Sequence, residues 1–312
     1  MKVVKKIIIL LVTTLTIFGC SKDESSEKNN NPNPIYLDDN GVTIKSYDWG
    51  EVGDIGEIDG EEFVIISENE LRERIKNSRD LYNVVTTKIT NMDYLFFDTV
   101  NEERYRTIDD RIVQWDVSNV TSMKGTFKDN ENSGGILNLL GHWDVSSVTN
   151  MSHLFEGSEL GGSFSLEDPY SLHNWDVRNV TDMSYMFKDI FNGGLLFIGY
   201  WDVSNVTNMS YMFNNSKIHN SVSLGNWDVS NVINMSHMFD SCEMDSPIGL
   251  WNVSNVKNME KMMYRIIYYN TYGTEGHNLN NWDVNKVTNC SEFSKGRSHG
   301  FDVPNFTNCD PN

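Results

Sequence analysis

One thirteen-residue phrase recurs along this chain and constrains its fold more than any other feature. The phrase is clearest at 201–213, which reads Trp-Asp-Val-Ser-Asn-Val-Thr-Asn-Met-Ser-Tyr-Met-Phe. Further copies begin at Trp115, Trp143, Trp175, Trp227, Trp251 and Trp282, and successive tryptophans are 28, 32, 26, 26, 24 and 31 residues apart. A period in this range is typical of a solenoid, in which each repeat buries its apolar side only against a neighbouring repeat.

The pattern inside the phrase predicts the elements of each repeat. Counting Trp as position one, Trp and Val at positions one and three alternate with Asp at position two, which indicates a short strand with Trp and Val inward. Ser-x-Met-Phe at positions ten to thirteen suits a short helical or 3-10 turn. A degenerate copy begins near Val84 and a truncated one at Phe301. We therefore expect a solenoid of about eight to nine repeats over residues 84–312, built from short parallel strands and such turns.

Residues 41–83 precede the repeats and are expected to form a small α+β cap. Residues 42–45 and 62–66 read as strands. Ser67 followed by Glu70 is a capping-box pattern that opens a short helix, with Leu71 and Ile75 on one face. The first repeat of a solenoid has an exposed apolar side, and this segment is expected to cover it.

The first twenty residues read as an export signal. Three lysines in the first six residues precede a short apolar stretch that ends in Gly19-Cys20, which resembles a bacterial lipobox. We expect cleavage before Cys20 and a lipid on its sulfur; an ordinary secretory signal with a chance cysteine is the alternative. The following Ser-Lys-Asp-Glu resembles the surface-export signal of Bacteroidetes lipoproteins. Residues 1–20 are thus predicted to be a lipoprotein signal peptide, and residues 21–40 a disordered tether to the cell outer membrane, with the protein surface-exposed.

The charge of the chain excludes one class of partner. Removing residues 1–20 removes three of the 25 basic side chains and none of the 44 acidic ones, so the formal net charge falls from −19 to −22. A charge of this sign and size opposes binding to nucleic acid or to anionic lipid head groups. The membrane contact is expected only through the lipid at Cys20.

Two of the four cysteines occupy a repeat position that is Met elsewhere. Cys290 and Cys309 stand at position nine, where other repeats have residues such as Met209. Equivalent positions on adjacent repeats lie roughly 5 Å apart, within disulfide reach. An exported protein keeps such a bond. We predict a Cys290–Cys309 disulfide that closes the C-terminal end, with two buried thiols as the alternative.

The repeated phrase resembles that of the BspA-like leucine-rich-repeat surface proteins, over roughly residues 84–309. The resemblance implies a leucine-rich-repeat-like solenoid, display on the cell surface, and adhesion or protein binding. The family has no catalytic residues to carry over. This chain differs in its loops, because the Phe-Asn-Gln-Asp segment usual before Trp is replaced by divergent sequence.

A solenoid turns each repeat position into a row of side chains. The Trp row is expected in the core, with an exposed platform for sugar rings as the alternative. The Asp row at position two is expected to accept backbone or Ser hydrogen bonds two residues on, with calcium bridging as the alternative. The Asn row at position eight is expected to satisfy the backbone. The Asp row comprises Asp116, Asp144, Asp176, Asp202, Asp228, Asn252, Asp283 and Asp302.

Position eleven is the candidate binding surface. Its neighbours at positions nine, twelve and thirteen are apolar, so its side chains are expected to face outward. Exposed Tyr and His in a continuous row are typical of recognition surfaces. The position-eleven stripe comprises Tyr94, His153, Tyr185, Tyr211 and His237. Partly buried surface filler is the alternative reading. The rival binding site is the variable loops, with Tyr170, Phe191, Phe197, Tyr200, Tyr268, Tyr269 and Tyr272.

Catalysis finds no support in the sequence. The seven histidines are scattered over different repeats, and no His-Glu-x-x-His, Gly-x-Ser-x-Gly or Walker motif occurs. We expect no cofactor and no metal. The predicted function is non-catalytic adhesion to an extracellular protein or glycan. A structural or self-assembling envelope protein is the alternative, and a glycan-processing enzyme is a third class.

Overall fold

The computed structural model of this protein describes a folded unit that begins at Asn33. The described residues are 32–77, 81–98, 103–104, 108, 110–130, 137–160, 172–191, 198–218, 224–268, 278–297 and 302–312. The predicted signal peptide, the lipid-bearing Cys20 and residues 21–31 of the predicted tether lie outside them. So do the loop residues Tyr170, Phe197, Tyr269 and Tyr272.

The N-terminal part combines two small sheets. Its strands are β1 (Ile35–Leu37), β2 (Ile44–Ser46), β3 (Ile55–Ile58), β4 (Glu61–Ile65) and β5 (Val84–Val85). β1 pairs with β2 and β3 with β4, both antiparallel, whereas β4 pairs with β5 in parallel. The predicted tether to residue 40 was therefore too long. Ile35 is 2% exposed and packs in a cluster with Ile44 and Val85. The folded part of the chain therefore begins before residue 40, because this apolar side chain is buried.

Helix α1 (Glu68–Lys76) confirms the helix predicted from the capping pattern. The Ser67 side chain accepts a hydrogen bond from the N–H of Glu70, and Leu71 and Ile75 are buried. Both side chains belong to the same cluster as the core of the repeats, so α1 covers the first repeat as expected of a cap. Within the described residues, no helix has the length and apolar character needed to cross a bilayer.

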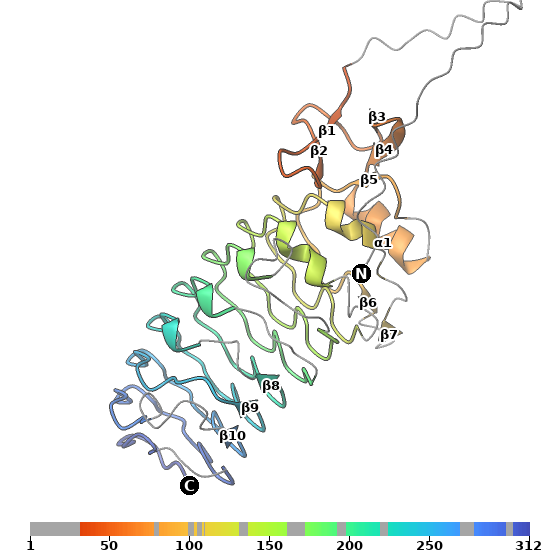
Figure 1. The fold of residues 1–312 in the computed structure, drawn as a ribbon. Coiled ribbons are helices and arrows are strands. Elements are labelled where there is room, and N and C mark those ends of the chain that lie inside the picture. Colours follow the sequence, from red (N-terminus) through yellow and green to blue (C-terminus); the bar gives the residue numbers. More distant parts are fainter. Residues whose placement is uncertain are drawn as a thin grey trace, which may run out of the picture. The chain divides into compact units, whose positions relative to one another are not determined.

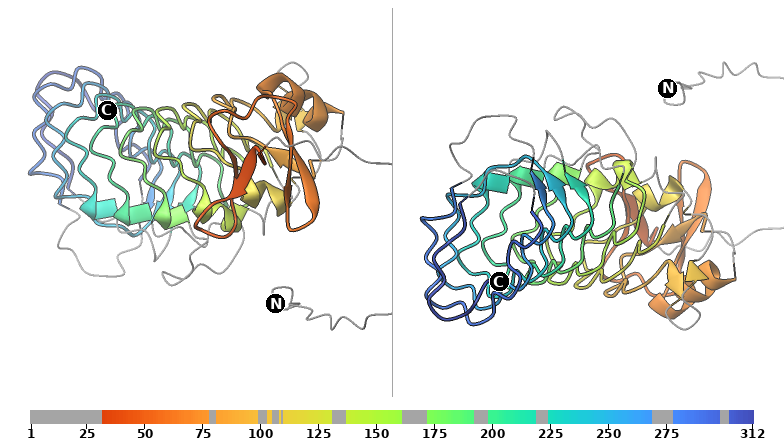
Figure 2. Two further views of the ribbon diagram at one scale, coloured as in Figure 1. Left: turned by 90° about the horizontal axis from the view of Figure 1, so that it is seen from above. Right: turned by 90° about the horizontal axis from the view of Figure 1, so that it is seen from below.

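The repeats lie next to one another in chain order (Figures 1 and 2). Parallel bridges join position eight of each repeat to position eight of the next, in the unbroken series Asn91, Ser122, Asn150, Asp182, Asn208, Asn234, Asn258 and Asn289. Strands β8 (Lys217–Ile218), β9 (Glu243–Met244) and β10 (Ile267–Tyr268) add a parallel three-stranded sheet. A short antiparallel pair, β6 (Phe97–Asp98) with β7 (Glu103–Arg104), follows the first repeat.

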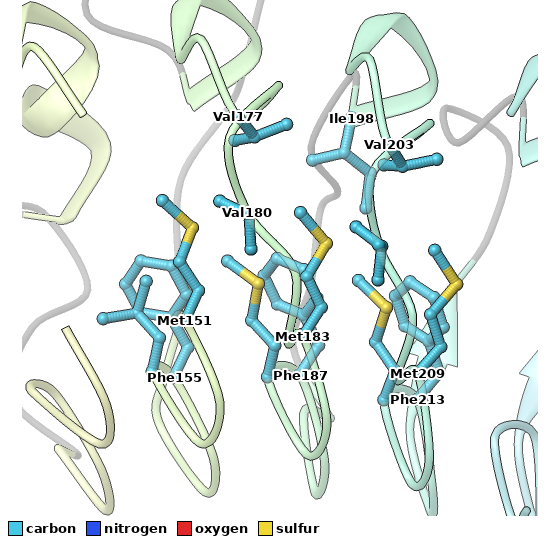
Figure 3. Packing of buried hydrophobic residues seen from close by; sticks show 14 of the residues in the cluster. Met151, Phe155, Val177, Val180, Met183, Phe187, Ile198, Val203, Met209 and Phe213 are labelled. Atoms are coloured by element: carbon cyan, nitrogen blue, oxygen red, sulfur yellow. The ribbon is translucent and has the colours of Figure 1, made fainter. Parts of the chain in front are cut away.

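The core consists of equivalent side chains in columns. Figure 3 shows Met151 and Phe155 beside the same pair in the following repeats, Met183 with Phe187 and Met209 with Phe213. The phenylalanine rings stack with centroids 5.7 to 5.8 Å apart from Phe127 to Phe239. Because each ring fills the space beside its neighbours, a repeat has no complete core of its own.

The helical turns of each repeat are not where the phrase predicted them. The 3-10 helices lie before the tryptophans, at η1 (Asp110–Gln114), η2 (Leu137–His142), η3 (Leu172–Asn174), η4 (Ile198–Tyr200) and η5 (Leu224–Asn226). Positions ten to thirteen form a non-helical turn instead, because position eleven is left-handed, with φ of +59° at Tyr211. Residues 201–203, the predicted strand, form no strand either. Their Trp and Val side chains nevertheless point inward, with Trp201 4% exposed.

Candidate functional site

The position-eleven stripe lies at a turn whose backbone is set by the contacts between repeats. The N–H of Tyr185 donates to the carbonyl of Ser210, and that of Tyr211 to Ser236, both at 2.9 Å. Reaching the next repeat in this way requires the left-handed conformation at every member of the stripe, with φ between +52° and +60°. That conformation costs a residue other than Gly roughly 1–2 kcal/mol, so the side chains here must offset it.

Four members of the stripe offset this cost by stacking. His153, Tyr185, Tyr211 and His237 form a continuous ring stack with centroid distances of 4.4, 4.5 and 4.3 Å and interplanar angles of 11°, 8° and 8°. Stacked aromatic pairs contribute about 0.5–1.5 kcal/mol beyond their buried area. Both faces of each tyrosine ring are covered by neighbouring rings, so the half-buried stack presents ring edges and hydroxyl groups to solvent.

Tyr94 is the member of the stripe that does not join the stack. The next repeat has Gly125 at position eleven, and the Tyr94 ring occupies the space there: a Cβ at Gly125 would lie 2.4 Å from its Cε1. The Tyr94 ring lies beside Phe97 instead, with 6.3 Å between the ring centroids. The four rings from His153 to His237 are continuous, and Gly125 separates Tyr94 from them. The role of the stripe in binding stays a prediction.

A carboxylate three residues on holds the imidazole at each end of the stack. His153 Nδ1 lies 2.6 Å from Glu156 Oε2, and His237 Nδ1 lies 2.8 Å from Asp240 Oδ2. Glu156 also pairs with Lys128 at 2.8 Å and with Lys188 at 3.1 Å, from the preceding and following repeats. Burial alone would raise the pKa of Glu156, but the hydrogen bonds from His153 and Lys128 outweigh it and lower the pKa to about 2.

The tyrosines of the stack remain protonated hydroxyl donors. Burial raises the pKa of both Tyr185 and Tyr211. Smaller contributions come from Tyr211 and Glu156 at Tyr185, and from Glu260 and Asp240 at Tyr211. The site therefore combines rigid rings, neutral hydroxyls and a row of paired charges. Sequence patterns identified the rings, whereas the Lys128–Glu156–Lys188 row at position fourteen was missed. The sequence does contain a pattern that predicts this row, because the charge at position fourteen alternates from one repeat to the next across these three.

The rival loop residues do not form a comparable surface where the structure describes them. Phe191 and Tyr200 are 53% and 69% exposed. Tyr268 is half-buried instead, and its hydroxyl donates to the carbonyl oxygens of Asp245 and Ser246 at 3.2 and 3.1 Å. Burial raises the pKa of Tyr268 as a result.

The three structural rows behave as predicted. The Trp side chains are 1–5% exposed, and the indole N–H of Trp201 donates to the carbonyl of Leu172 at 2.9 Å. Asp202 accepts from the N–H and hydroxyl of Ser204 at 3.1 and 2.6 Å, and the same backbone bond occurs at every member of its row before Asp302. At position eight, Asn208 accepts from the N–H of Ser210 in the same way. These Asx turns satisfy backbone N–H groups at each bend.

The cysteines are divided between a bond and the core. Cys290 and Cys309 form a disulfide, with their Cα atoms 5.8 Å apart. Cys242 is a fully buried thiol whose pKa is raised by burial. Among the described residues, no three His, Cys, Asp or Glu side chains gather where they could hold a metal ion.

Comparison with known proteins identifies the repeats. Residues 68–190, 159–272 and 195–303 each match the family described as "Mycoplasma protein of unknown function, DUF285". The three overlapping matches together run from the start of α1 into the truncated copy that begins at Phe301. No curated protein and no solved structure matches the chain. Because the matched residues make up more than half of the sequence, the chain belongs to the DUF285 family.

Proposed function

We propose that this protein is a surface-exposed lipoprotein that binds an extracellular protein or glycan without catalysis, through a solenoid of the leucine-rich-repeat type. The solenoid is supported by the unbroken series of parallel bridges from Asn91 to Asn289. The placement in the outer membrane, and the narrower assignment to BspA-like surface proteins, rest on the Gly19-Cys20 signal and on the repeated phrase.

The observation that carries the proposal is the ring stack. Its four rings come from four consecutive repeats and are held by one another and by the two terminal carboxylates. A surface whose rings are already ordered loses little conformational entropy when a partner docks.

The geometry of the ring stack also limits how a partner could contact it. A sugar ring stacks on an aromatic face, and the faces of Tyr185 and Tyr211 are covered by their neighbours. The exposed groups are ring edges and phenol hydroxyls. The partner is therefore expected to accept hydrogen bonds from these hydroxyls, as backbone carbonyls of a protein or hydroxyls of a glycan do.

Two paired double variants test this proposal on an array of matrix proteins and glycans. Replacing Tyr185 and Tyr211 with Ala removes the rings, and we expect binding to fall at least about tenfold. Replacing both with Phe keeps the stack and removes the hydroxyls, so an intermediate loss would identify the hydroxyls as donors. Tyr200→Ala is the control, because Tyr200 is 69% exposed and lies outside the stripe. Binding that survives the Ala pair and disappears with Tyr200→Ala would assign recognition to the loops.

Self-assembly is a second candidate, favoured by the C-terminal end of the repeats. In each repeat the N–H groups at positions nine and eleven donate to the next repeat, as Met259 does to Asn289 and Lys261 to Ser291. In the last repeat the N–H groups of Cys290 and Glu292 have no acceptor within the described residues. Such an open ladder edge is a template for another chain. Light scattering over a concentration series tests this function, and a monomer at all concentrations would contradict it.

A further inference from the structure

An exposed aromatic patch lies on the N-terminal cap, and none of its residues belongs to the position-eleven stripe. Tyr36 on β1 packs against Tyr47, with ring centroids 4.6 Å apart and an angle of 37°. Tyr47 in turn stacks on Trp49, at 5.7 Å and 7°. We name these three residues the cap aromatic patch. Tyr47 and Trp49 are 43% and 48% exposed.

Trp49 differs from every other tryptophan of the chain. The other seven form the Trp row and are at most 5% exposed. Trp49 stands outside the repeats, in the turn after β2, and this turn is fixed by the Lys88 ammonium, which donates to the carbonyl of Asp48 at 3.3 Å. A half-exposed Trp costs solubility and contributes little packing, so packing alone does not account for the residue.

The chain segment that carries the patch is acidic. Residues 33–66 contain nine acidic side chains and one basic side chain, Lys45. The Lys45 ammonium is paired with Asp38 at 3.2 Å. Asp48 precedes Trp49 and Glu51 follows it two residues later, and both are exposed. Anionic ligands such as acidic polysaccharides or phospholipid head groups are disfavoured here by charge.

We propose that the cap aromatic patch is a docking site for a basic segment of a partner protein, whose Lys or Arg side chain lies on the face of Trp49 that Tyr47 does not cover. Aromatic faces attract ammonium and guanidinium groups through the negative charge of their π clouds. The flanking carboxylates supply the opposite charge and steer the approach of a cationic chain. This site is independent of the ring stack, because the two share no residue. The inference does not require that the stack binds a partner.

A short peptide of alternating Arg and Gly is the probe for this site. Its binding to the full chain is measured by titration at low salt, for the wild type and for a variant with Tyr47→Ala and Trp49→Ala. The variant keeps every charge, so nonspecific attraction to the acidic protein is unchanged. We expect it to bind the peptide about tenfold more weakly. Tyr200→Ala, which removes an exposed ring elsewhere, is expected to bind like the wild type.

Trp49→Phe tests whether any aromatic ring at this position is sufficient for binding. It retains a face for the cation, and its affinity is expected to stay close to that of the wild type. A Tyr47→Ala and Trp49→Ala variant that binds the peptide as tightly as the wild type would overturn the proposal. So would binding of neutral oligosaccharides at Trp49 that about 0.5 M salt leaves unchanged, because a cationic ligand is screened at that ionic strength.

Fluorescence gives a second measurement that needs no destabilising variant. Because the Trp row is buried, Trp49 is expected to dominate the emission that acrylamide quenches. Bound peptide is expected to protect this component, and Trp49→Phe is expected to abolish the quenchable part. Saturating peptide that leaves the quenching of the wild type unchanged would place the peptide elsewhere and overturn the proposal.

Discussion

The two ends of the repeat series face opposite chemical problems. Each repeat donates its N–H groups at positions nine and eleven to the repeat that follows. At these positions the first repeat is therefore left with carbonyl oxygens to satisfy, and the last with N–H groups. The N–H at position seven donates in the other direction, as Thr207 does to Thr181. At the N-terminal end, Arg72 of α1 donates to the carbonyls of Asp93 and Asn91 at 2.9 and 3.3 Å. At the C-terminal end, the Cys290–Cys309 disulfide fixes the chain, while the N–H of Glu292 has no acceptor among the described residues.

This difference shows that a repeat ladder has a direction and that its two caps are not interchangeable. A guanidinium carries several donors and suits an end that presents acceptors. No side chain offers the complementary row of acceptors at the last repeat within the described residues, and a covalent bond restrains that end instead. The interior repeats need neither device, because each one is satisfied by its neighbours.

The largest expected loss of stability comes from replacing a tryptophan, and the loss should differ between an interior repeat and the last one. Trp201→Ala is expected to lower the free energy of unfolding by about 3–5 kcal/mol, because it leaves a cavity in the core. Replacement by Phe is the finer comparison. Trp201→Phe leaves the Leu172 carbonyl without its donor and is expected to cost about 1–2 kcal/mol more than Trp282→Phe. Among the residues that the structure describes, the indole N–H of Trp282 has no acceptor to lose. Urea unfolding of each variant measures both values, and equal costs at the two positions would contradict the comparison.

Sequence patterns predicted the features that depend on residues close together in the chain. They identified the inward Trp row, the Asx turns after Asp202 and its equivalents, and the helix that Ser67 begins, because each depends on local spacing. They misplaced the 3-10 helices, since the left-handed turn at Tyr211 follows from hydrogen bonds to the next repeat, and nothing local in Ser-Tyr-Met-Phe reveals it. Arg72 escaped notice for the same reason, because its acceptors lie 19 and 21 residues away.

The disulfide is expected to give the next largest effect, confined to the C-terminal end. It closes a loop with a sequence separation of 19 residues, for which chain entropy predicts a contribution of about 3 kcal/mol. Reduction, or Cys309→Ser, should therefore speed hydrogen exchange in residues 278–297 and leave the repeats near α1 unchanged. Intact mass with and without reductant checks the bond itself. A mass that does not rise by about two daltons on reduction would show that the bond is absent.

Acid is expected to weaken the N-terminal half in a way that reduction does not. The pKa of Glu156 is lowered from 4.5 to about 2 in the folded protein. A lowered carboxyl pKa stabilises the fold above the unfolded value, so this contribution is present above pH 4.5 and is lost as the pH falls toward about 2. The loss is on the order of 3 kcal/mol for a side chain this well buried.

Glu156→Gln is the variant that tests this acid sensitivity. Gln has no charge to lose, so the variant should be less stable than the wild type at neutral pH and should approach it in acid. Urea midpoints at several pH values below 6 measure the trend. Glu62→Gln is the matched control, because it makes the same change of side chain at an exposed position of β4. A wild-type midpoint that stays constant from pH 5 to about pH 2 would exclude the network as a source of stability.

Arg72 gives the smallest effect and the sharpest test of the cap. Arg72→Met keeps the length of the side chain but removes the donors to Asn91 and Asp93, and we expect a loss of about 1–2 kcal/mol, since charged hydrogen bonds of a partly exposed group are screened. Arg74→Met on the same helix is the matched control. Arg74 pairs with Glu70 at 2.6 Å on the surface, and such a pair contributes only about 0.3–0.5 kcal/mol. Hydrogen exchange near Asn91 should quicken for Arg72→Met alone. If both variants lose the same stability, the guanidinium of Arg72 acts as an ordinary surface charge, and the contact of α1 with the first repeat is apolar.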